Sequence, residues 1–215
     1  MKTKLLFCLC LLITLFTSKL KAQIDLGIDE GSYNPRSIFS FTCPLAEGSK
    51  INNKYGISLG VVAGVLLNEK FYLGAYGYKL ANTSSTFTKK DYLCEDGVHR
   101  DLKLSFGHVG LIVGYYHSQE KPVHWGITSK IGMGTISLID NGYGYYAKKY
   151  LNNSVYVVTP QLELEFDLSD WIKLNLGVGY RYTINVKNNA YSQSDFNSPV
   201  VSLSFAFGKF RETEE

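Results

Sequence analysis

One polar stretch of the chain, residues 91–101 (DYLCEDGVHRD), holds a histidine close to several acids. His99 lies near Asp96 and Asp101, a combination that a hydrolase could use at an exposed rim. No nucleophile motif or metal-ligand spacing accompanies it, so a solvated polar loop is the preferred interpretation. The other histidines lie on different predicted strands without ligand spacing; they are His108, His117 and His124. We therefore expect no enzyme activity, no metal site and no cofactor.

Tyrosines and lysines gather in a second stretch, residues 141–150 (NGYGYYAKKY). Tyrosine rings offer rigid amphipathic contact surface, and lysines can meet a phosphate or an acidic sugar. One hypothesis is that this loop binds a surface glycan or a lipid headgroup. The alternative is an extension of an aromatic girdle with two solvated lysines. The candidate binding residues are Tyr143, Tyr145, Tyr146, Lys148, Lys149 and Tyr150.

A third group of polar residues alternates strictly with apolar ones across residues 156–184. Gln161, Glu163, Glu165 and Asp167 interleave with leucines and a phenylalanine, and after Ser169-Asp170 the same alternation continues to residue 184. A period of two over this length predicts β-strands with one apolar and one polar face. The stretch is therefore a hairpin.

The same alternation predicts eight antiparallel strands and no second domain. Short connections at 68–70, 118–122 and 169–170 alternate with long ones at 83–102, 140–153 and 185–198, as outer-membrane barrels show. Pro160 interrupts its strand, and we expect a bulge there. The predicted strands are 36–46, 55–67, 71–82, 104–116, 124–138, 156–168, 172–184 and 200–207.

Alternation alone does not decide between a soluble, lipocalin-like barrel and a membrane barrel. The clear strands run about 13 to 16 residues, whereas soluble strands cluster near 5 to 6 and membrane strands need about 9 to 11. Aromatic residues also flank the short turns, as an interfacial girdle requires. This girdle comprises Phe71, Tyr72, Tyr115, Tyr116, Trp125 and Trp171.

Charges on the polar face give the third argument for a membrane barrel. A connection centred near residue 146 places Lys130 across from Glu163, and the tight turn places Lys173 across from Asp167. A lysine or arginine facing lipid costs about 2 to 4 kcal/mol near the midplane, so in a membrane barrel these charges must face the lumen, whereas on a soluble barrel they would be solvated. The predicted lumen charge network is Lys130, Glu163, Glu165, Asp167, Lys173 and Arg181.

The N-terminus has the features of a secretory signal peptide, with a basic start, an apolar run and cleavage expected after Ala22. Its four lysines leave with it, so the mature chain has 18 basic against 19 acidic residues, and no nucleic-acid partner is expected. The expected domains are a signal peptide (1–22), a periplasmic lead-in (23–35), the barrel (36–210) and a polar tail (211–215). Cys43 and Cys94 remain after processing, either as a disulfide or as two free thiols.

The chain resembles the small eight-stranded outer-membrane barrels, the OmpA/OmpX/OmpW-like class, across residues 36–210. The segments that carry this resemblance are 55–78 (YGISLGVVAGVLLNEKFYLGAYGY) and 198–210 (SPVVSLSFAFGKF). It implies that the protein lies in the outer membrane of a Gram-negative bacterium, where outer-membrane lipid contacts the barrel. It also implies recognition by the barrel-assembly machinery through Phe205, Phe207 and Phe210. The class contains structural, adhesive, transport and enzymatic members. We expect a structural or surface-interaction role with a filled lumen and binding loops, and a narrow pore is the alternative.

Overall fold

Alternating residues form long antiparallel strands in the computed structural model, which describes residues 38–68, 70–81, 87–94, 97–117, 122–140, 149–187 and 190–210. The expected signal peptide, lead-in and C-terminal tail lie outside these ranges. In chain order the strands are β1 (Ile38–Ile51), β2 (Lys54–Leu67), β3 (Phe71–Leu80), β4 (Thr88–Leu93), β5 (His99–His117), β6 (Val123–Asp140), β7 (Lys149–Ser169), β8 (Ile172–Ile184) and β9 (Ser198–Gly208). A short 3-10 helix, η2 (Gln193–Asp195), precedes β9. Among the described residues, no helix is long and apolar enough to cross a membrane.

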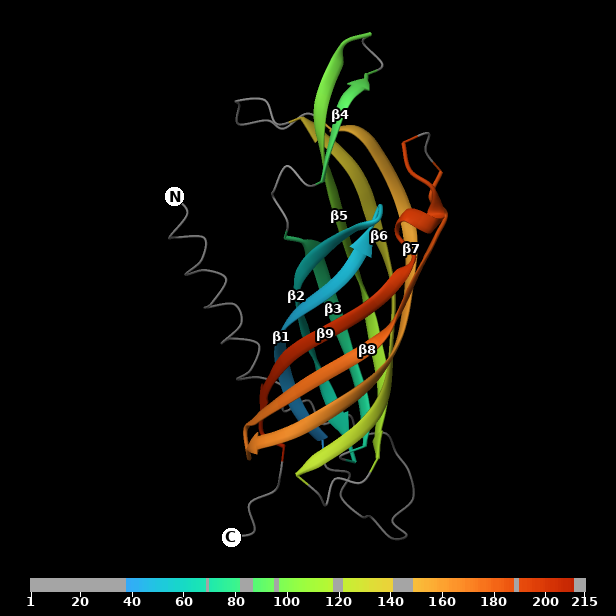
Figure 1. The fold of residues 1–215 in the computed structure, drawn as a ribbon. Helices are drawn as coiled ribbons and strands as arrows, with labels where there is room; N and C mark the ends of the chain where they lie inside the picture. The colour runs from blue at the N-terminus through green and yellow to red at the C-terminus, as the bar shows by residue number, and fades with distance from the viewer. Residues whose placement is uncertain are drawn as a thin grey trace, which may run out of the picture. The chain divides into compact units, whose positions relative to one another are not determined.

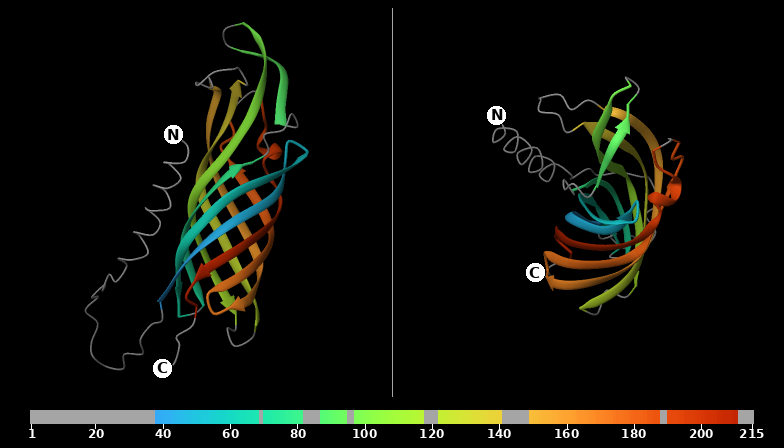
Figure 2. Two further views of the ribbon diagram at one scale, coloured as in Figure 1. Left: turned by 90° about the vertical axis from the view of Figure 1, so that its left-hand side faces the viewer. Right: turned by 45° about the horizontal axis from the view of Figure 1, so that its top comes forward.

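Eight of these strands close into a barrel (Figures 1 and 2). Neighbours pair in the order β3-β2-β1-β9-β8-β7-β6-β5, and β3 pairs with β5 to close the ring. Every pair is antiparallel, so the predicted all-β, eight-stranded up-and-down barrel is confirmed. The remaining strand, β4, pairs with the start of β5 and lies outside the ring. The predicted loop at 83–102 thus contains a strand and the beginning of β5.

The connection between β1 and β2 differs from the predicted pattern. It is a two-residue turn, Asn52-Asn53, in which both residues have positive φ, 49° and 59°. Asparagine tolerates this left-handed conformation, which tight hairpin turns require. The turn lies at the same end of the barrel as the three long connections, here called the long-loop end. The first strand also continues to Ile51 and does not end at residue 46.

The inner face of the barrel changes character along β7. Towards the long-loop end, Val155 and Val157 point inward and are buried, whereas Gln161 and Glu163 occupy the inner face further along. The outer face of β7 changes from polar to apolar in the same direction: Ser154 near the long-loop end is exposed, and apolar side chains follow it on this face towards the short turns. The inward apolar residues belong to a cluster that also includes Leu102, Leu104, Phe106, Ile136 and Leu138.

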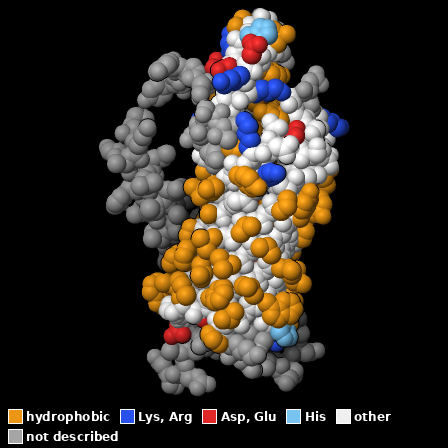
Figure 3. Space-filling model, in the orientation of Figure 1, with side chains coloured by type: hydrophobic (Ala, Val, Ile, Leu, Met, Phe, Trp, Pro, Cys, Tyr) orange, Lys and Arg blue, Asp and Glu red, His pale blue; other side chains and the backbone are white. Residues whose placement is uncertain are grey.

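This reversal divides the barrel into two zones. Near the long-loop end the wall is packed like a soluble protein, with an apolar interior. Over the rest of the barrel the apolar residues point outward, and on the face shown in Figure 3 hydrophobic side chains gather over the wall below the charged end. Typical members of this outward band are 53% to 61% exposed; they include Val61, Leu111, Ile131, Leu162 and Val201.

Candidate functional site: the charged lumen and the long-loop end

Arg181 on β8 is fully buried and joins three parts of the barrel. Its Nη1 lies 3.4 Å from Glu47 Oε1 and donates to Ser49 Oγ at 3.1 Å, both on β1. Its Nε donates to the carbonyl of Phe196, just after η2, at 3.0 Å. Arginine suits such a site because its planar guanidinium presents five fixed donors. Arg181 therefore ties β8 to β1 and to the connection that precedes β9.

Glu47 is the anion that the sequence analysis missed. Its Oε2 lies 3.8 Å from Lys130 Nζ on β6, so one buried carboxylate faces two cations. Lys130 also donates to Gln161 Oε1 and lies 5.3 Å from the centre of the Tyr78 ring. The acids in the predicted lumen charge network all lie on β7, and as partners of Arg181 they are wrong: the described ion-pair partner of Arg181 is Glu47 on β1. The signal for Glu47 was its phase with Cys43 and Leu45, which also point inward.

The predicted pairing of Lys130 with Glu163 is also wrong. The β6–β7 register places Lys130 opposite Thr159 and Glu163 opposite Gly126. This hairpin is centred earlier than residue 146, so Lys130 pairs with a residue of β7 that lies before Glu163; the irregularity at Leu138/Ile139 changes the register by one residue only. Glu163 instead accepts hydrogen bonds from Tyr116 Oη at 2.5 Å and Thr128 Oγ1 at 2.7 Å.

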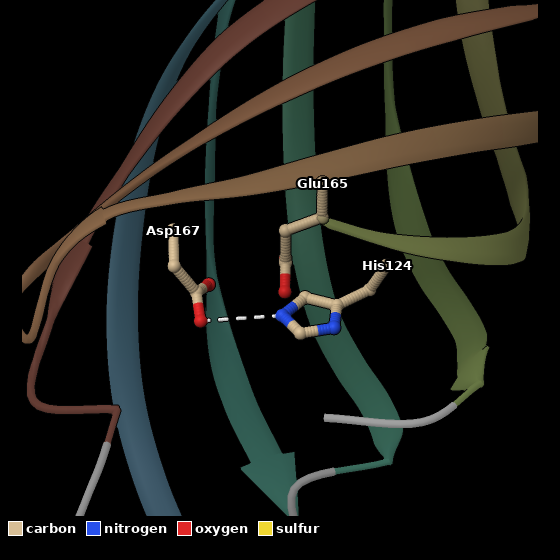
Figure 4. A group of neighbouring side chains, drawn as sticks. All are labelled: His124, Glu165 and Asp167. Atoms are coloured by element: carbon tan, nitrogen blue, oxygen red, sulfur yellow. Dashed lines mark hydrogen bonds and ion pairs between the residues drawn. The ribbon is translucent and has the colours of Figure 1, made fainter. Parts of the chain in front are cut away.

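A second charge cluster lies nearer the short turns. Lys173 stands opposite Asp167 in the β7–β8 register, and its Nζ lies 2.7 Å from Glu165 Oε1 and 3.3 Å from Asp167 Oδ1. His124 on β6 stands opposite Glu165, and its Nε2 lies 3.2 Å from Asp167 Oδ2 (Figure 4). The sequence analysis left His124 without a partner, because only the β6–β7 register brings it to these acids.

His124, Glu165 and Asp167 converge closely enough to hold a metal ion, with one ligand atom from each within 4.8 Å of the others (Figure 4). However, the ammonium of Lys173 already lies within ion-pair distance of both carboxylates. A buried cation of this kind supplies the positive charge that a metal would otherwise bring. We therefore interpret the cluster as an ion-pair network that links β6, β7 and β8.

Aromatic rings occupy the space that inward glycines leave. A Cβ at Gly126 would lie 2.5 Å from the Tyr116 ring, and one at Gly60 would lie 2.9 Å from the Tyr78 ring. His108 fills the space beside Tyr78, with ring centres 5.2 Å apart. The space that these glycines leave is therefore taken by side chains from neighbouring strands.

The predicted aromatic girdle divides into two groups. Phe71, Tyr115, Trp125 and Trp171 point outward and are 37% to 60% exposed. Tyr72 and Tyr116 point into the lumen and are 8% and 1% exposed, so their assignment to the girdle is wrong. The reason is strand parity, because consecutive residues such as Phe71 and Tyr72 must face opposite sides of the wall.

Parity also separates the three phenylalanines of the expected assembly signal. Phe205 and Phe207 on β9 point outward, whereas Phe210 is buried and its ring lies 5.0 Å from Lys173 Nζ. The assembly role of Phe205 and Phe207 stays a prediction.

The two cysteines, Cys43 and Cys94, are free thiols, so the disulfide alternative is wrong. Cys43 lies in the apolar cluster of the lumen and Cys94 in the cluster at the long-loop end. Pro160 does not form a bulge, because the β6–β7 and β7–β8 registers continue unchanged on both sides of it. The β7–β8 ladder simply lacks the pairs at residues 159 and 160. Proline has no N–H to donate there.

At the long-loop end, the structure gives His99 a partner other than the expected acids. Its Nδ1 lies 2.8 Å from Asp91 Oδ1, and both side chains are exposed. Asp101 accepts a hydrogen bond from the Asp91 backbone N–H at 3.0 Å, and Asp96 lies outside the described residues. His99 thus braces the β4–β5 hairpin.

Most of the tyrosine-rich candidate loop falls outside the described part of the chain. Tyr143, Tyr145, Tyr146 and Lys148 lie in that gap, and so does the side chain of Lys149. Tyr150 is described: the Arg100 guanidinium lies 5.0 Å from the centre of its ring.

No family model and no curated protein matches the chain. Neisserial surface protein A is similar in structure at a TM-score of 0.54 and 13% identity, over 80% of this chain and 97% of that one. Ail, the attachment invasion locus protein of Yersinia pestis, gives a TM-score of 0.44 at 9% identity, over 80% and 97% of the two chains. The N-terminal β-barrel domain of Pseudomonas aeruginosa OprF gives 0.44 at 9%, over 79% and 96%. The closed ring of eight antiparallel strands and its likeness to the Neisserial protein show that this chain has the fold of the small eight-stranded outer-membrane β-barrels.

Proposed function

We propose that this chain is an integral outer-membrane protein of a Gram-negative bacterium, in which a filled barrel anchors a binding surface at the long-loop end. The observation that carries the proposal is the direction in which the charged and the apolar side chains of the barrel wall point. Lys130, Lys173 and Arg181 are buried inside, whereas a band of large apolar side chains points outward. A soluble, lipocalin-like barrel requires the opposite arrangement.

Physical costs support a lipid environment for the outer face. Soluble monomers rarely expose a contiguous apolar patch larger than about 300 to 600 Å². Here outward apolar residues such as Leu59, Val109 and Leu203 occur on strands all around the ring. Bilayer hydrocarbon would cover this band, and the inward charges would stay away from lipid.

The filled lumen favours an anchor over the alternative of a narrow pore. Buried aromatic rings and the two charge clusters occupy the described interior from Phe41 and Tyr72 to Arg181 and Phe196. An eight-stranded barrel has an interior only wide enough for side chains. The binding surface would then be the part of β4 to β7 that extends beyond the β1–β2 turn (Figure 1). This role requires lipid and the barrel-assembly machinery as partners, and neither catalysis nor nucleic acid.

The proposal is tested by fractionation and by mobility on a denaturing gel. The protein should sediment with outer membranes, and its boiled and unboiled forms should migrate differently, since a closed barrel resists detergent until heated. Recovery in the soluble periplasmic fraction, with no shift on heating, would reject the membrane assignment. Single-channel conductance steps in a planar bilayer would contradict the filled lumen and support the alternative of a narrow pore.

A further inference from the structure

A cavity of about 350 Å³ lies at the long-loop end. Segments that are distant in sequence line it: the β1–β2 turn with the start of β2, the β4 segment with Phe87 before it, Leu104 on β5, and the connection that precedes η2. Its lining includes Lys54, Phe87, Thr88, Lys89, Lys90 and Tyr191. Among the described lining residues there are three lysines and no carboxylate, so the cavity carries a concentrated positive charge.

The ammonium group of Lys89 is held in place by the protein. Lys89 Nζ donates to the Ala190 carbonyl at 2.8 Å and lies 5.2 Å and 5.5 Å from the rings of Tyr191 and Tyr92. A lysine ammonium carries three N–H donors, and this hydrogen bond uses one. Fixing such a side chain in advance lowers the entropic cost of binding a ligand.

Aromatic rings supply the apolar part of the cavity. Phe87 is buried and would touch a Cβ at Gly56, so the missing side chain at that position makes room for its ring. Burial raises the pKa of Tyr191 to about 12, and the nearby charges of Asp195 and Tyr92 add to this effect. A tyrosine hydroxyl is protonated at neutral pH even without this shift, so Tyr191 brings an O–H group to the lining of the cavity.

We propose that this cavity binds an acidic saccharide, a sugar that carries a phosphate, sulfate or carboxylate group. The lysines would meet the anion, Thr88 and Tyr191 the sugar hydroxyls, and the aromatic rings the C–H face of a sugar ring. The volume lies at the low end for small-molecule pockets, about 300 to 1,000 Å³, which suits one or two sugar rings. The inference rests on the proposed function, because it needs the long-loop end to face the outside of the cell.

The test uses the mature protein in phosphatidylcholine nanodiscs and isothermal titration with trehalose 6-phosphate, trehalose and inorganic phosphate. The phosphorylated sugar should bind at least about tenfold more tightly than either of the others, since it alone offers both chemistries. Equal binding of plain trehalose would show that the cavity does not recognise charge. Equal binding of inorganic phosphate would show that it does not recognise the sugar. Either result overturns the proposal.

Lysine variants locate the binding. Lys54→Met and Lys90→Met replace exposed lining residues and should each weaken binding of trehalose 6-phosphate about tenfold. Lys187→Met is the matched control, an exposed lysine at the same end that does not line the cavity, and it should leave binding unchanged. Equal effects of all three substitutions would overturn the proposal.

The source of the saccharide is distinguished by repeating the titration in nanodiscs that contain lipopolysaccharide. Loss of trehalose 6-phosphate binding there would identify the membrane's own phosphorylated glycolipid as the occupant. Retained binding would identify a soluble or foreign glycan. A protein that shows heat-dependent mobility yet does not bind the phosphorylated sugar would contradict this inference alone and leave the proposed function in place.

Discussion

Glu47 and Arg181 form a buried ion pair across the lumen, with 3.4 Å between Oε1 and Nη1. Their strands are not neighbours, because β9 lies between β1 and β8 in the ring. The second oxygen of Glu47 faces Lys130 on β6 at 3.8 Å. One carboxylate thus connects three strands by paths that the backbone ladders do not provide.

Replacing Glu47 with glutamine should be strongly destabilising. Two buried cations would then face a neutral amide, and loss of one partner of a buried pair typically costs about 3 to 5 kcal/mol. Urea unfolding in lipid vesicles would measure the change in the free energy of unfolding. Asp140→Asn is the control, since its half-buried pair with Arg100 spans 3.8 Å and should contribute less than about 1 kcal/mol. Equal losses for the two variants would contradict the central role of Glu47.

Removing Lys173 should convert its cluster into a metal site. In the Lys173→Ala variant, His124, Glu165 and Asp167 would converge without the cation that now lies between the carboxylates. A Zn²⁺ concentration of 100 times the dissociation constant would raise the stability of this variant by about 2.7 kcal/mol. The measurement is urea unfolding with and without Zn²⁺, and adding His124→Asn should abolish the effect. Equal stabilisation of the wild-type protein by Zn²⁺ would show that Lys173 does not block the site.

Adding a methyl group at Gly126 should disturb the lumen. The new Cβ would lie 2.5 Å from the Tyr116 ring and 2.8 Å from a backbone oxygen, so the Gly126→Ala variant must displace a buried ring that donates to Glu163. Overpacking of this kind costs about 1 to 3 kcal/mol. Gly77→Ala is the matched control, because its Cβ would meet Val109 at an ordinary 3.5 Å. If both variants were as stable as the wild type, the Tyr116 ring would not fill the lumen at Gly126 as described.

The sequence predicts the fold well where one signal dominates. Strict alternation from residue 156 to residue 184 defines the β7–β8 hairpin and its tight turn, because one face of this stretch is mainly apolar and the other mainly polar. Residues 47–51 give no such signal, since Gly48 and Lys50 interrupt the outer apolar face and the segment resembles a loop. The predicted strand therefore ended before Glu47, although Glu47 lies in phase with the inward residues Cys43 and Leu45.

The partners of the inward charges depend on register, and a sequence does not fix register across a long connection. The long β6–β7 connection is centred earlier than residue 146, which places Lys130 opposite Thr159 and not Glu163, whereas the tight turn after β7 keeps Lys173 opposite Asp167. The reversal of the two faces near Val155 was hidden for a different reason. The residues of β7 before Val155 have polar side chains on the outer face, so their composition is that of a loop although they form part of the strand.

The two tryptophans of the chain test the central claim, an apolar outer wall in contact with lipid, most directly. Trp125 and Trp171 point outward and are 49% and 60% exposed. Their fluorescence should be quenched in vesicles of brominated phosphatidylcholine, more by bromines near the headgroups than by bromines deep in the chains, as for an interfacial girdle. Fluorescence that brominated lipids leave unchanged, while aqueous acrylamide quenches it fully, would contradict the membrane barrel.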